Sequence, residues 1–279
     1  MTATVVISTK DRLEELTNCL ESLRRQTRRP EELVIVDAAG DAKVREALDD
    51  FRSDFAKVDY HHFPSSLPQA RNFAIARSSG DAVVFLDDDL VLEAGFIEEL
   101  LGTLERDPEL GGACGDITNH ERDGQPLKAA FKKLFQLPHD GDGRFRLGGA
   151  PTMVYGLPDE LEVEFLPGGL TAWRREVFKE FLFDDRLPGL GVNEDVDFSY
   201  RVSRKWKNAY NPRAKVRHLR PEPKREATLG YLRQELWSHW YLYFKNRPGG
   251  LLGFPAACLH TAGILLRYSF RLARTGGTR

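Results

Sequence analysis

Short β-rich runs alternate with amphipathic stretches through the first third of the chain, and this alternation limits the fold more than any other feature. Four runs have the composition of strands: TVVIST (4–9), EELVIVD (31–37), KVDYHHF (57–63) and DAVVFLD (81–87). Between them the apolar residues follow helical spacing, as in DRLEELTNCLESLRRQT (11–27). Such alternation predicts an α/β fold with a mostly parallel sheet and helices on both faces.

Composition limits the class of protein. The chain has 279 residues, of which 41% are hydrophobic and 29% are charged, a globular balance with room for one large domain or two small ones. A net charge of -2 provides no basic field that would attract nucleic acid. Cys19, Cys114 and Cys258 are far apart and odd in number, which argues against a disulfide framework and against a zinc site.

The pattern changes in the middle of the chain. Residues 119–160 are rich in Gly, Asp and Lys and have weak periodicity, which indicates an insertion or a mobile lid. Residues 161–183, LEVEFLPGGLTAWRREVFKEFLF, are interpreted as a strand, a glycine turn and a helix. A helix over 193–206, a strand over 214–219 and a long helix over 227–246 follow. We therefore expect a main domain over residues 1–222 and a helical C-terminal region over 223–279.

The segment 251–270, LLGFPAACLHTAGILLRYSF, is mostly apolar but contains Pro255, His260 and Arg267, so it falls short of an uninterrupted membrane span. Two interpretations remain open. The helix packs on the domain or in a homodimer interface, or it lies on a membrane surface, which the basic ending RLARTGGTR favours. The first residues, MTATVVISTKDR, lack a signal-peptide pattern. We therefore expect a cytoplasmic protein, either free or peripheral at the inner face of the membrane.

Three adjacent carboxylates end the fourth run, in VVFLDDDL (83–90). Neighbouring carboxylates in a desolvated place raise one another's pKa unless a cation lies between them. Asp87 and Asp89 project to the same side of an extended segment, so they can share a divalent cation, and oxygen donors favour Mg²⁺ or Mn²⁺. The alternative is an acidic turn that caps a helix around residues 93–104. Since ligands bind at the carboxyl ends of parallel strands, Asp37 and this cluster should share one edge.

A second group of carboxylates begins a predicted helix in GVNEDVDFSY (191–200). A carboxylate there serves as an N-cap or as a general base, and one would suffice as a cap. His218 ends a predicted strand, and Arg71 lies just upstream of the carboxylate strand. Each has a structural alternative: a satisfied histidine and a surface ion pair, although a guanidinium also suits a diphosphate.

Five segments, in this order and spacing, resemble family 2 glycosyltransferases of the GT-A fold. They are TVVISTKDRLEELTNCLESLRRQT, ELVIVD, QARNFAIARSSGDAVVFLDDDLVL, FLPGGLTAWRREVF and GVNEDVDFSYRV, and together they cover roughly residues 3–220. The resemblance implies a Rossmann-like central sheet and a C-terminal helical extension. It also implies transfer of a sugar from a nucleotide diphosphate donor to a glycan or lipid-linked acceptor, with inversion at the anomeric carbon and with Mg²⁺ or Mn²⁺ as cofactor.

The resemblance assigns roles to single positions. The donor-binding residues would be Thr9, Asp37, Arg71, Asp87 and Asp88. The metal would be held by Asp89 and His218. The loop under the sugar and the acceptor would contribute Gly168, Gly169, Thr171, Trp173 and Glu194, with core packing as the alternative for Trp173. Asp195 would be the catalytic base.

The sequence departs from the family pattern at one place, and two other functions are alternatives to sugar transfer. The second strand ends in IVDAAG, where the family commonly has a second acidic residue and a Gly-Ser turn. A UDP-sugar is therefore a preference for the donor and not a deduction, and GDP or dTDP stay open. A sugar-phosphate nucleotidyltransferase is the first alternative, but STKDRLEEL lacks the glycine-rich phosphate loop that this chemistry needs. The second is a non-catalytic nucleotide-sugar-binding protein, because a fold alone does not determine function.

Overall fold

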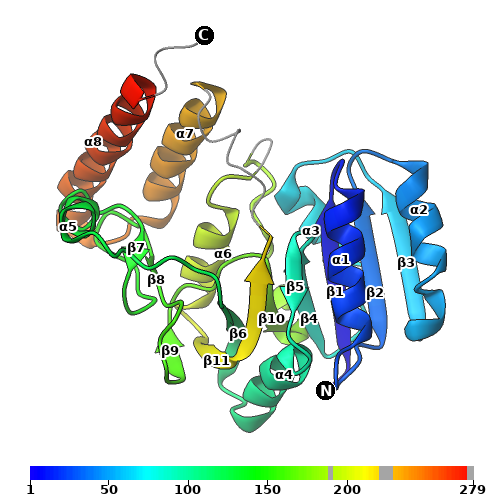
Figure 1. Cartoon of the computed structure of the whole chain (residues 1–279). Coiled ribbons are helices and arrows are strands. Elements are labelled where there is room, and N and C mark those ends of the chain that lie inside the picture. The colour runs from blue at the N-terminus through cyan, green and yellow to red at the C-terminus, as the bar shows by residue number, and fades with distance from the viewer. Residues whose placement is uncertain (188–190, 220–228, 275–279) are drawn as a thin grey trace. The chain divides into compact units, whose positions relative to one another are not determined.

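The computed structural model describes residues 1–187, 191–219 and 229–274, and packing divides the chain into two units (Figure 1). Unit 1 comprises Met1–His120 and Tyr155–Leu219, and unit 2 comprises Glu121–Val154 with the described part of 220–279. The predicted domain boundary at residue 222 lies outside the described residues. Most of the segment predicted as an insertion or lid belongs to unit 2.

The first half of unit 1 follows the predicted alternation. Its elements are β1 (Ala3–Thr9), α1 (Leu13–Arg24), β2 (Glu32–Asp37), α2 (Ala42–Asp49), η1 (Arg52–Asp54), β3 (Lys57–His62), α3 (Leu67–Ile75) and β4 (Ala82–Asp87). β1, β2 and β4 are buried along almost their whole length, as expected of parallel strands that are covered on both faces. α1 buries Leu16, Leu20 and Leu23 on one side, which is the helical spacing seen in the sequence.

The second half of unit 1 departs from the sequence analysis at β10 and at β6. Its elements are β5 (Leu90–Leu92), α4 (Phe96–Arg106), β6 (Leu110–Ile117), β9 (Leu161–Val163), β10 (Leu170–Arg174), η2 (Arg175–Lys179), α6 (Glu194–Val202) and β11 (Lys207–His218). After the glycine turn, LTAWR forms strand β10 and REVFK forms the short 3₁₀ helix η2, where a helix was predicted. β10 pairs with strands on both sides, and this tertiary pairing outweighs the helical spacing of the segment.

Strand β6 is a second difference, because the sequence analysis did not identify it. Its sequence, LGGACGDI, contains three glycines that weaken strand propensity. The packing around the glycines explains them: a Cβ on Gly112 would lie 2.5 Å from Trp173, and one on Gly115 would lie 2.2 Å from the carbonyl oxygen of Ala214. The glycines therefore let neighbouring side chains and backbone approach the strand.

Within the described residues, nine strands form one sheet in the order β3-β2-β1-β4-β10-β6-β11-β5, with β9 paired to β11. β1, β2, β3 and β4 are mutually parallel, β10 runs antiparallel to both β4 and β6, and β11 runs parallel to β6. The register sets Thr9 opposite Asp37 and Ser8 opposite Asp87. The carboxyl ends of β1, β2, β4, β6 and β11 therefore meet the start of β10 at one edge of the sheet.

Unit 2 is mainly helical. Its elements are α5 (Pro126–Leu134), β7 (His139–Asp140), β8 (Thr152–Met153), α7 (Leu229–Asn246) and α8 (Gly250–Arg274). The imidazoles of His239 and His260 stack with centroids 4.3 Å apart and connect α7 to α8. Burial lowers the pKa of both to about 4, so the pair is neutral near pH 7.

Candidate active site

The three adjacent aspartates lie where β4 ends and a two-residue turn leads into β5, and a basic side chain faces each of them. Asp88 accepts hydrogen bonds from the Thr9 hydroxyl at 2.7 Å and from the Arg12 guanidinium at 2.9 Å. Asp89 lies between Arg12, at 3.0 Å from Oδ2, and His218, at 3.0 Å from Oδ1. Asp87 lies 3.7 Å from Arg71. The protein therefore offsets this run of like charges with three separate basic side chains.

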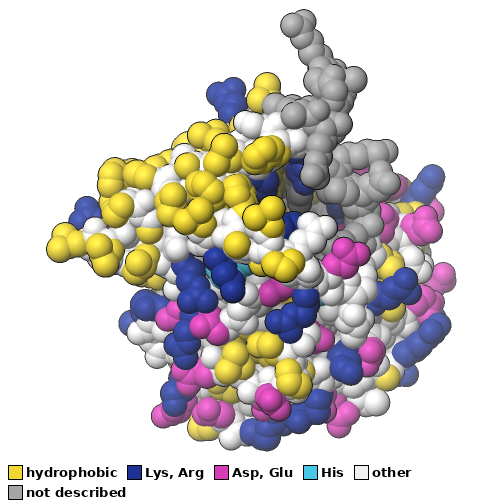
Figure 2. Space-filling view, turned by 60° about the vertical axis from the view of Figure 1, so that its left-hand side comes forward, with side chains coloured by type: hydrophobic (Ala, Val, Ile, Leu, Met, Phe, Trp, Pro, Cys, Tyr) yellow, Lys and Arg dark blue, Asp and Glu magenta, His cyan; other side chains and the backbone are white. Residues whose placement is uncertain are grey.

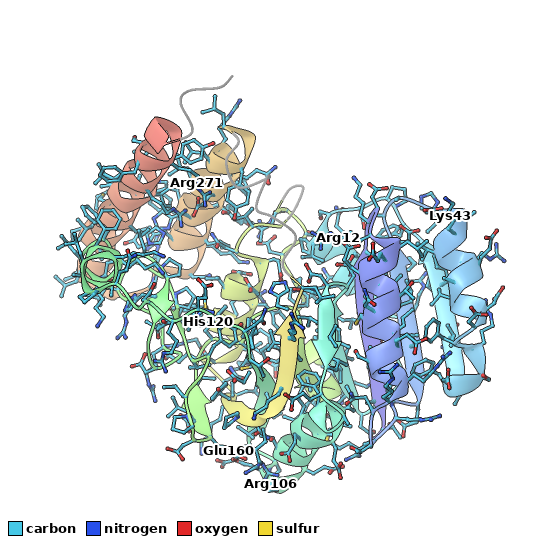
Figure 3. The ribbon with its side chains drawn as sticks, viewed as in Figure 1. Arg12, Lys43, Arg106, His120, Glu160 and Arg271 are labelled. Carbon is cyan, nitrogen blue, oxygen red and sulfur yellow. The ribbon has the colours of Figure 1, made fainter. Side chains whose placement is uncertain are left out.

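Arg12 is a functional candidate that the sequence analysis missed. It lies in the loop between β1 and α1, at the upper edge of the sheet in Figure 3, and its Nη1 contacts both Asp88 and Asp89. Burial raises the pKa of Asp88 to about 6, although Thr9 and Arg12 oppose this effect. Burial also acts to raise the pKa of Asp89, but His218 and Arg12 outweigh it and hold that pKa below its usual value.

A second cluster joins Asp87 to the start of α6 through Arg71. Arg71 is 3% exposed, so it is not the surface ion pair that the sequence left open. Its Nη1 donates to Glu194 Oε1 at 2.5 Å, and its guanidinium lies over the rings of Phe85 and Phe183. Glu194 Oε2 is buried and accepts no hydrogen bond from the residues that the structure describes. Burial raises the pKa of Glu194 to about 8: Arg71 opposes this, while Asp195 and Asp87 add to it.

Two glycines bring the backbone of one loop against this cluster. A Cβ on Gly169 would lie 2.0 Å from Asp87 Cγ, and a Cβ on Gly168 would lie 2.5 Å from Arg71 Nη1. Any side chain at these positions would displace the charged groups. The loop before β10 therefore needs glycine in order to lie beside both carboxylate groups.

Asp195 occupies the first turn of α6. Its Oδ2 accepts the Gly168 N–H at 3.1 Å and its Oδ1 accepts the Val196 N–H at 2.8 Å. Burial raises the pKa of Asp195, whereas Arg71 and these backbone donors act in the opposite direction. The result is a carboxylate of increased basicity that is held in place from both sides, which suits a general base.

Asp37 ends β2 and is fully buried. Its oxygens accept the backbone N–H groups of Ala39 and Asp41, at 2.8 and 3.0 Å, and the hydroxyl of Tyr60 at 2.9 Å. Burial, followed by the hydrogen bond to Asp37, raises the pKa of Tyr60 to about 12. Asp37 thus organises the loop that begins with Ala38 and Ala39.

Thr171 and Trp173 do not lie at the edge with the other predicted residues. Both are buried inside β10, where the Trp173 indole N–H donates to the Thr171 hydroxyl at 3.0 Å. The Trp173 ring packs edge-on against Phe198 with centroids 4.9 Å apart. With 2% of its surface exposed, Trp173 is a core residue, and the stacking on a sugar that was one of its two interpretations has no room here.

The residues around Asp89 fit a divalent cation that shares its coordination with a bound substrate. In the part of the chain that the structure describes, no cluster of three His, Cys, Asp or Glu side chains forms a complete metal site. Asp89 Oδ1 is buried, and within the described ranges it accepts no hydrogen bond of normal geometry, although His218 Nε2 lies 3.0 Å away. Asn119 fixes the backbone of His218 with two hydrogen bonds. A carboxylate plus substrate phosphates is a common way to hold Mg²⁺.

Two sequence relatives are named as glycosyltransferases. The chain is 28% identical over 149 residues to an uncharacterized glycosyltransferase, YwdF, of Bacillus subtilis (strain 168), a match that covers 50% of this chain and 52% of the relative. It is 31% identical over 121 residues to the glucosyl-dolichyl phosphate glucuronosyltransferase of Haloferax volcanii, with 42% and 38% of the two chains covered. The matched regions thus span about half or less of these relatives.

Solved structures and a family model extend the match. The mannosyltransferase PcManGT from Pyrobaculum calidifontis, in complex with GDP-Man and Mn²⁺, superposes with a TM-score of 0.64 at 17% identity over 99% of this chain and 75% of its own. GalNAc-T7 with UDP, GalNAc and Mn²⁺ gives 0.63 at 16% identity over 98% and 57%. These likenesses show the fold, which is GT-A. The model for "Glycosyl transferase family 2" matches residues 4–182, and the chain therefore belongs to glycosyl transferase family 2.

Proposed function

We propose that the protein transfers a sugar from a nucleotide diphosphate donor to a hydroxyl of a glycan or lipid-linked acceptor, with inversion and with Asp195 as general base. The observation that carries this proposal is the separation of the two carboxylate groups at one sheet edge. Asp88 and Asp89 face Arg12 and His218, whereas Asp195 faces the glycine loop and lies in the cluster of Arg71. One group is suited to the leaving diphosphate and the other to the acceptor.

The chemistry follows from that division. Asp195 would take the proton of the acceptor hydroxyl while the oxygen of that hydroxyl attacks the anomeric carbon from the face opposite the diphosphate. The bond from the anomeric carbon to the diphosphate oxygen breaks, and its electron pair leaves with the diphosphate. The raised pKa of Asp195 supports this role, because a more basic carboxylate takes a proton more readily. Inversion results from the single displacement.

The donor would bind along the ends of β1, β2 and β4, through the predicted residues Thr9, Asp37, Arg71, Asp87 and Asp88. A UDP-sugar is the preferred donor, with GDP and dTDP as the other candidates. Arg71 and Asp37 are already engaged with protein groups. We therefore expect Arg71 to act on the donor through the positions of Asp87 and Glu194 more than as a direct ligand of the diphosphate.

Asp89 and His218 would hold Mg²⁺ or Mn²⁺ beside the diphosphate. The presence of Mn²⁺ with the donor or its nucleotide in PcManGT and GalNAc-T7 supports a divalent cation here. When bound, the cation would neutralise charge that develops on the leaving diphosphate. The Arg12 contact with Asp88 and Asp89 keeps both carboxylates oriented toward that place.

Substitution of the proposed base tests the function. Asp195→Asn should lower turnover by roughly 10²- to 10⁴-fold while the thermal shift produced by UDP, GDP or dTDP with Mn²⁺ stays near that of the wild type. Asp49→Asn, the same chemical change at an exposed position of α2, is the control. Near-native turnover of Asp195→Asn would exclude Asp195 as the base. Pyrophosphate release from a nucleoside triphosphate would favour a nucleotidyltransferase, and nucleotide binding without turnover on any acceptor would favour a binding protein.

A further inference from the structure

One side of α8 exposes a continuous row of large apolar side chains. They are Leu251, Leu252, Phe254, Leu259, Leu265, Leu266 and Phe270, called here the α8 face. Their exposed fractions run from 36% for Leu259 to 99% for Leu251. Figure 2 shows apolar side chains gathered into one broad yellow patch over the region of α8. A patch of this kind on a soluble protein marks an interaction site.

The opposite side of α8 packs inside unit 2. Ala257, His260, Ile264 and Tyr268 are buried and recur at a spacing of three or four residues, as one stripe of a helix does. His239 contacts the carbonyl oxygen of Ala257 at 3.1 Å, and His260 contacts that of Gln136 at 2.7 Å. This buried stripe packs α8 against the rest of unit 2. The α8 face lies on the opposite side of the helix and is a separate apolar surface.

The surface continues onto α7 and α5. Phe254 lies 5.8 Å from the ring of Trp240, which in turn lies 5.7 Å from Phe244, a residue with 59% of its surface exposed. On α5, Leu127 and Leu134 are 85% and 63% exposed and stand seven residues apart, on one side of the helix. Exposed aromatic and leucine side chains on helices with lysine nearby are typical of proteins that lie in a membrane interface.

The charged residues of α5 and α8 indicate which kind of surface covers the α8 face. Residues 126–134 and 250–274 contain three lysines and three arginines and no acidic residue, and of these six, Lys132 pairs with Asp123 and Arg267 pairs with Glu235 of α7. A symmetric dimer through this surface would place the same basic helices against each other, because such an interface uses one patch on both copies. An anionic lipid surface instead complements the charge and accepts the apolar side chains, with about 1 kcal/mol from each basic residue near it.

By length and composition alone, Gly250–Arg271 is the one helix among the described residues that could cross a membrane. Its contacts argue against that. A Cβ on Gly263, near the middle of α8, would lie 2.5 Å from Phe135, which directly follows α5. A spanning α8 would therefore carry Lys132, Lys133 and the irregular backbone after α5 to the depth of the hydrocarbon, at high cost.

From these observations we propose that unit 2 docks on an anionic bilayer surface, with α8 lying in the membrane plane and its apolar face inserted between the lipid headgroups. Lys128 and Lys133 of α5, both exposed, contact the headgroups. This inference does not depend on the enzymatic proposal, since it rests on unit 2 alone. If the acceptor is lipid-linked, docking also brings the enzyme to the surface that holds it.

Vesicle flotation of the full chain tests the proposal. The wild type should float with vesicles that contain phosphatidylglycerol and much less with phosphatidylcholine alone, and binding should weaken as salt is raised. The triple variant Leu251→Ser, Leu252→Ser and Phe254→Ser should bind the vesicles roughly tenfold more weakly or worse, because it removes inserted apolar surface. The matched control is Leu161→Ser with Leu182→Ser, which changes exposed leucines of unit 1 and should leave binding unchanged.

Charge reversal separates lipid binding from other outcomes. Lys128→Glu with Lys133→Glu should lower binding to the anionic vesicles by roughly tenfold or more, whereas Lys43→Glu, at the exposed surface of α2 (Figure 3), should not. Sedimentation without lipid should give a monomer whose mass the serine variant does not change. A wild type that stays with neither vesicle type, or a dimer that the serine variant dissociates, would overturn the proposal. Binding that resists high salt and is released only by detergent would overturn the in-plane arrangement.

Discussion

The two units of this chain use apolar and charged side chains in opposite ways. Of the fifteen large apolar side chains that are exposed in the described residues, thirteen belong to unit 2, although it is the smaller unit. Unit 1 instead buries charged groups, among them Asp37, Arg71, Asp89 and Glu194, while the described residues of unit 2 bury no Asp, Glu, Lys or Arg. Both arrangements are costly for a folded protein, because buried charge loses hydration and exposed apolar surface orders water.

The difference indicates two kinds of work. Burial raises the pKa values of Asp88 and Glu194 above their usual range, although nearby arginines act in the opposite direction, and such shifts are typical of a site where protons or charge move. Exposed apolar side chains have no proton to exchange, and they stabilise the protein only when another surface covers them. This contrast supports both proposals, which assign the chemistry to unit 1 and the contact with a membrane surface to unit 2.

The largest effect on stability should follow from breaking the buried ion pair of unit 1. Arg71→Met removes the buried cation that faces Glu194, Asp87 and Asp195 and should lower the free energy of unfolding by about 3 kcal/mol, near the low end for such pairs because the raised pKa of Glu194 leaves that group protonated at pH 7. Urea denaturation at pH 7 measures the loss. Arg77→Met is the control on the same stretch of chain: its guanidinium is exposed over Phe73, and its removal should cost about 1 kcal/mol or less.

Equal losses for the two arginine variants would contradict the comparison. They would mean that the cluster of Arg71, Glu194 and Asp87 contributes no more than a surface contact does, and that burial of charge is not what distinguishes unit 1.

The sequence predicted the arrangement of the strand ends but not the partners of the side chains there. Asp37 and Asp87 share an edge as predicted, because the alternation of strands and helices implies parallel pairing and parallel strands end together. Arg12 gave no signal, since it stands at the predicted start of a helix, where an exposed arginine is ordinary. Its contact with Asp88 and Asp89 spans more than seventy residues of sequence and is visible only in the folded chain.

The two errors in secondary structure have one cause. β6 contains three glycines and β10 contains an apolar spacing compatible with a helix, so local preference favours neither as a strand. They pair with each other in the middle of the sheet, and the glycines of β6 admit the indole ring of Trp173 from β10. Trp173 is buried for the same reason. Local pattern cannot detect an element that is stabilised mainly by its neighbours.

The second prediction concerns the pH dependence of stability. The pKa of Glu194 is raised to about 8 in the folded protein from an ordinary value of 4.5, so between these values the folded state keeps a proton that the unfolded state has lost. The stability contributed by this proton is complete below about pH 4.5 and is lost as the pH rises toward 8, with a slope of at most about 1.4 kcal/mol per pH unit. Glu194→Gln should flatten this decline.

Denaturation from pH 5 to pH 8 measures the slope, with Glu46→Gln, an exposed position on α2, as the control that keeps it. Asp87, Asp88 and Asp195 also have raised pKa values, so part of the decline should remain in Glu194→Gln. A wild type whose stability rises over this range would show that Arg71 keeps Glu194 ionised, and the charge balance assigned to unit 1 would be wrong.

The smallest effect on stability should come from a substitution in unit 2, and a small effect is what the proposed membrane contact requires. Leu251 is 99% exposed, so Leu251→Ser removes almost no buried surface and should change the free energy of unfolding by no more than about 0.5 kcal/mol. Leu242→Ser on α7, where the leucine is 6% exposed, should cost several times more because it places a hydroxyl in the packed interior. A loss above roughly 1 kcal/mol for Leu251→Ser would mean that the α8 face packs within the folded chain. A neutral result means that the fold gains no stability from this leucine, as expected of a residue that is proposed to contact a membrane surface.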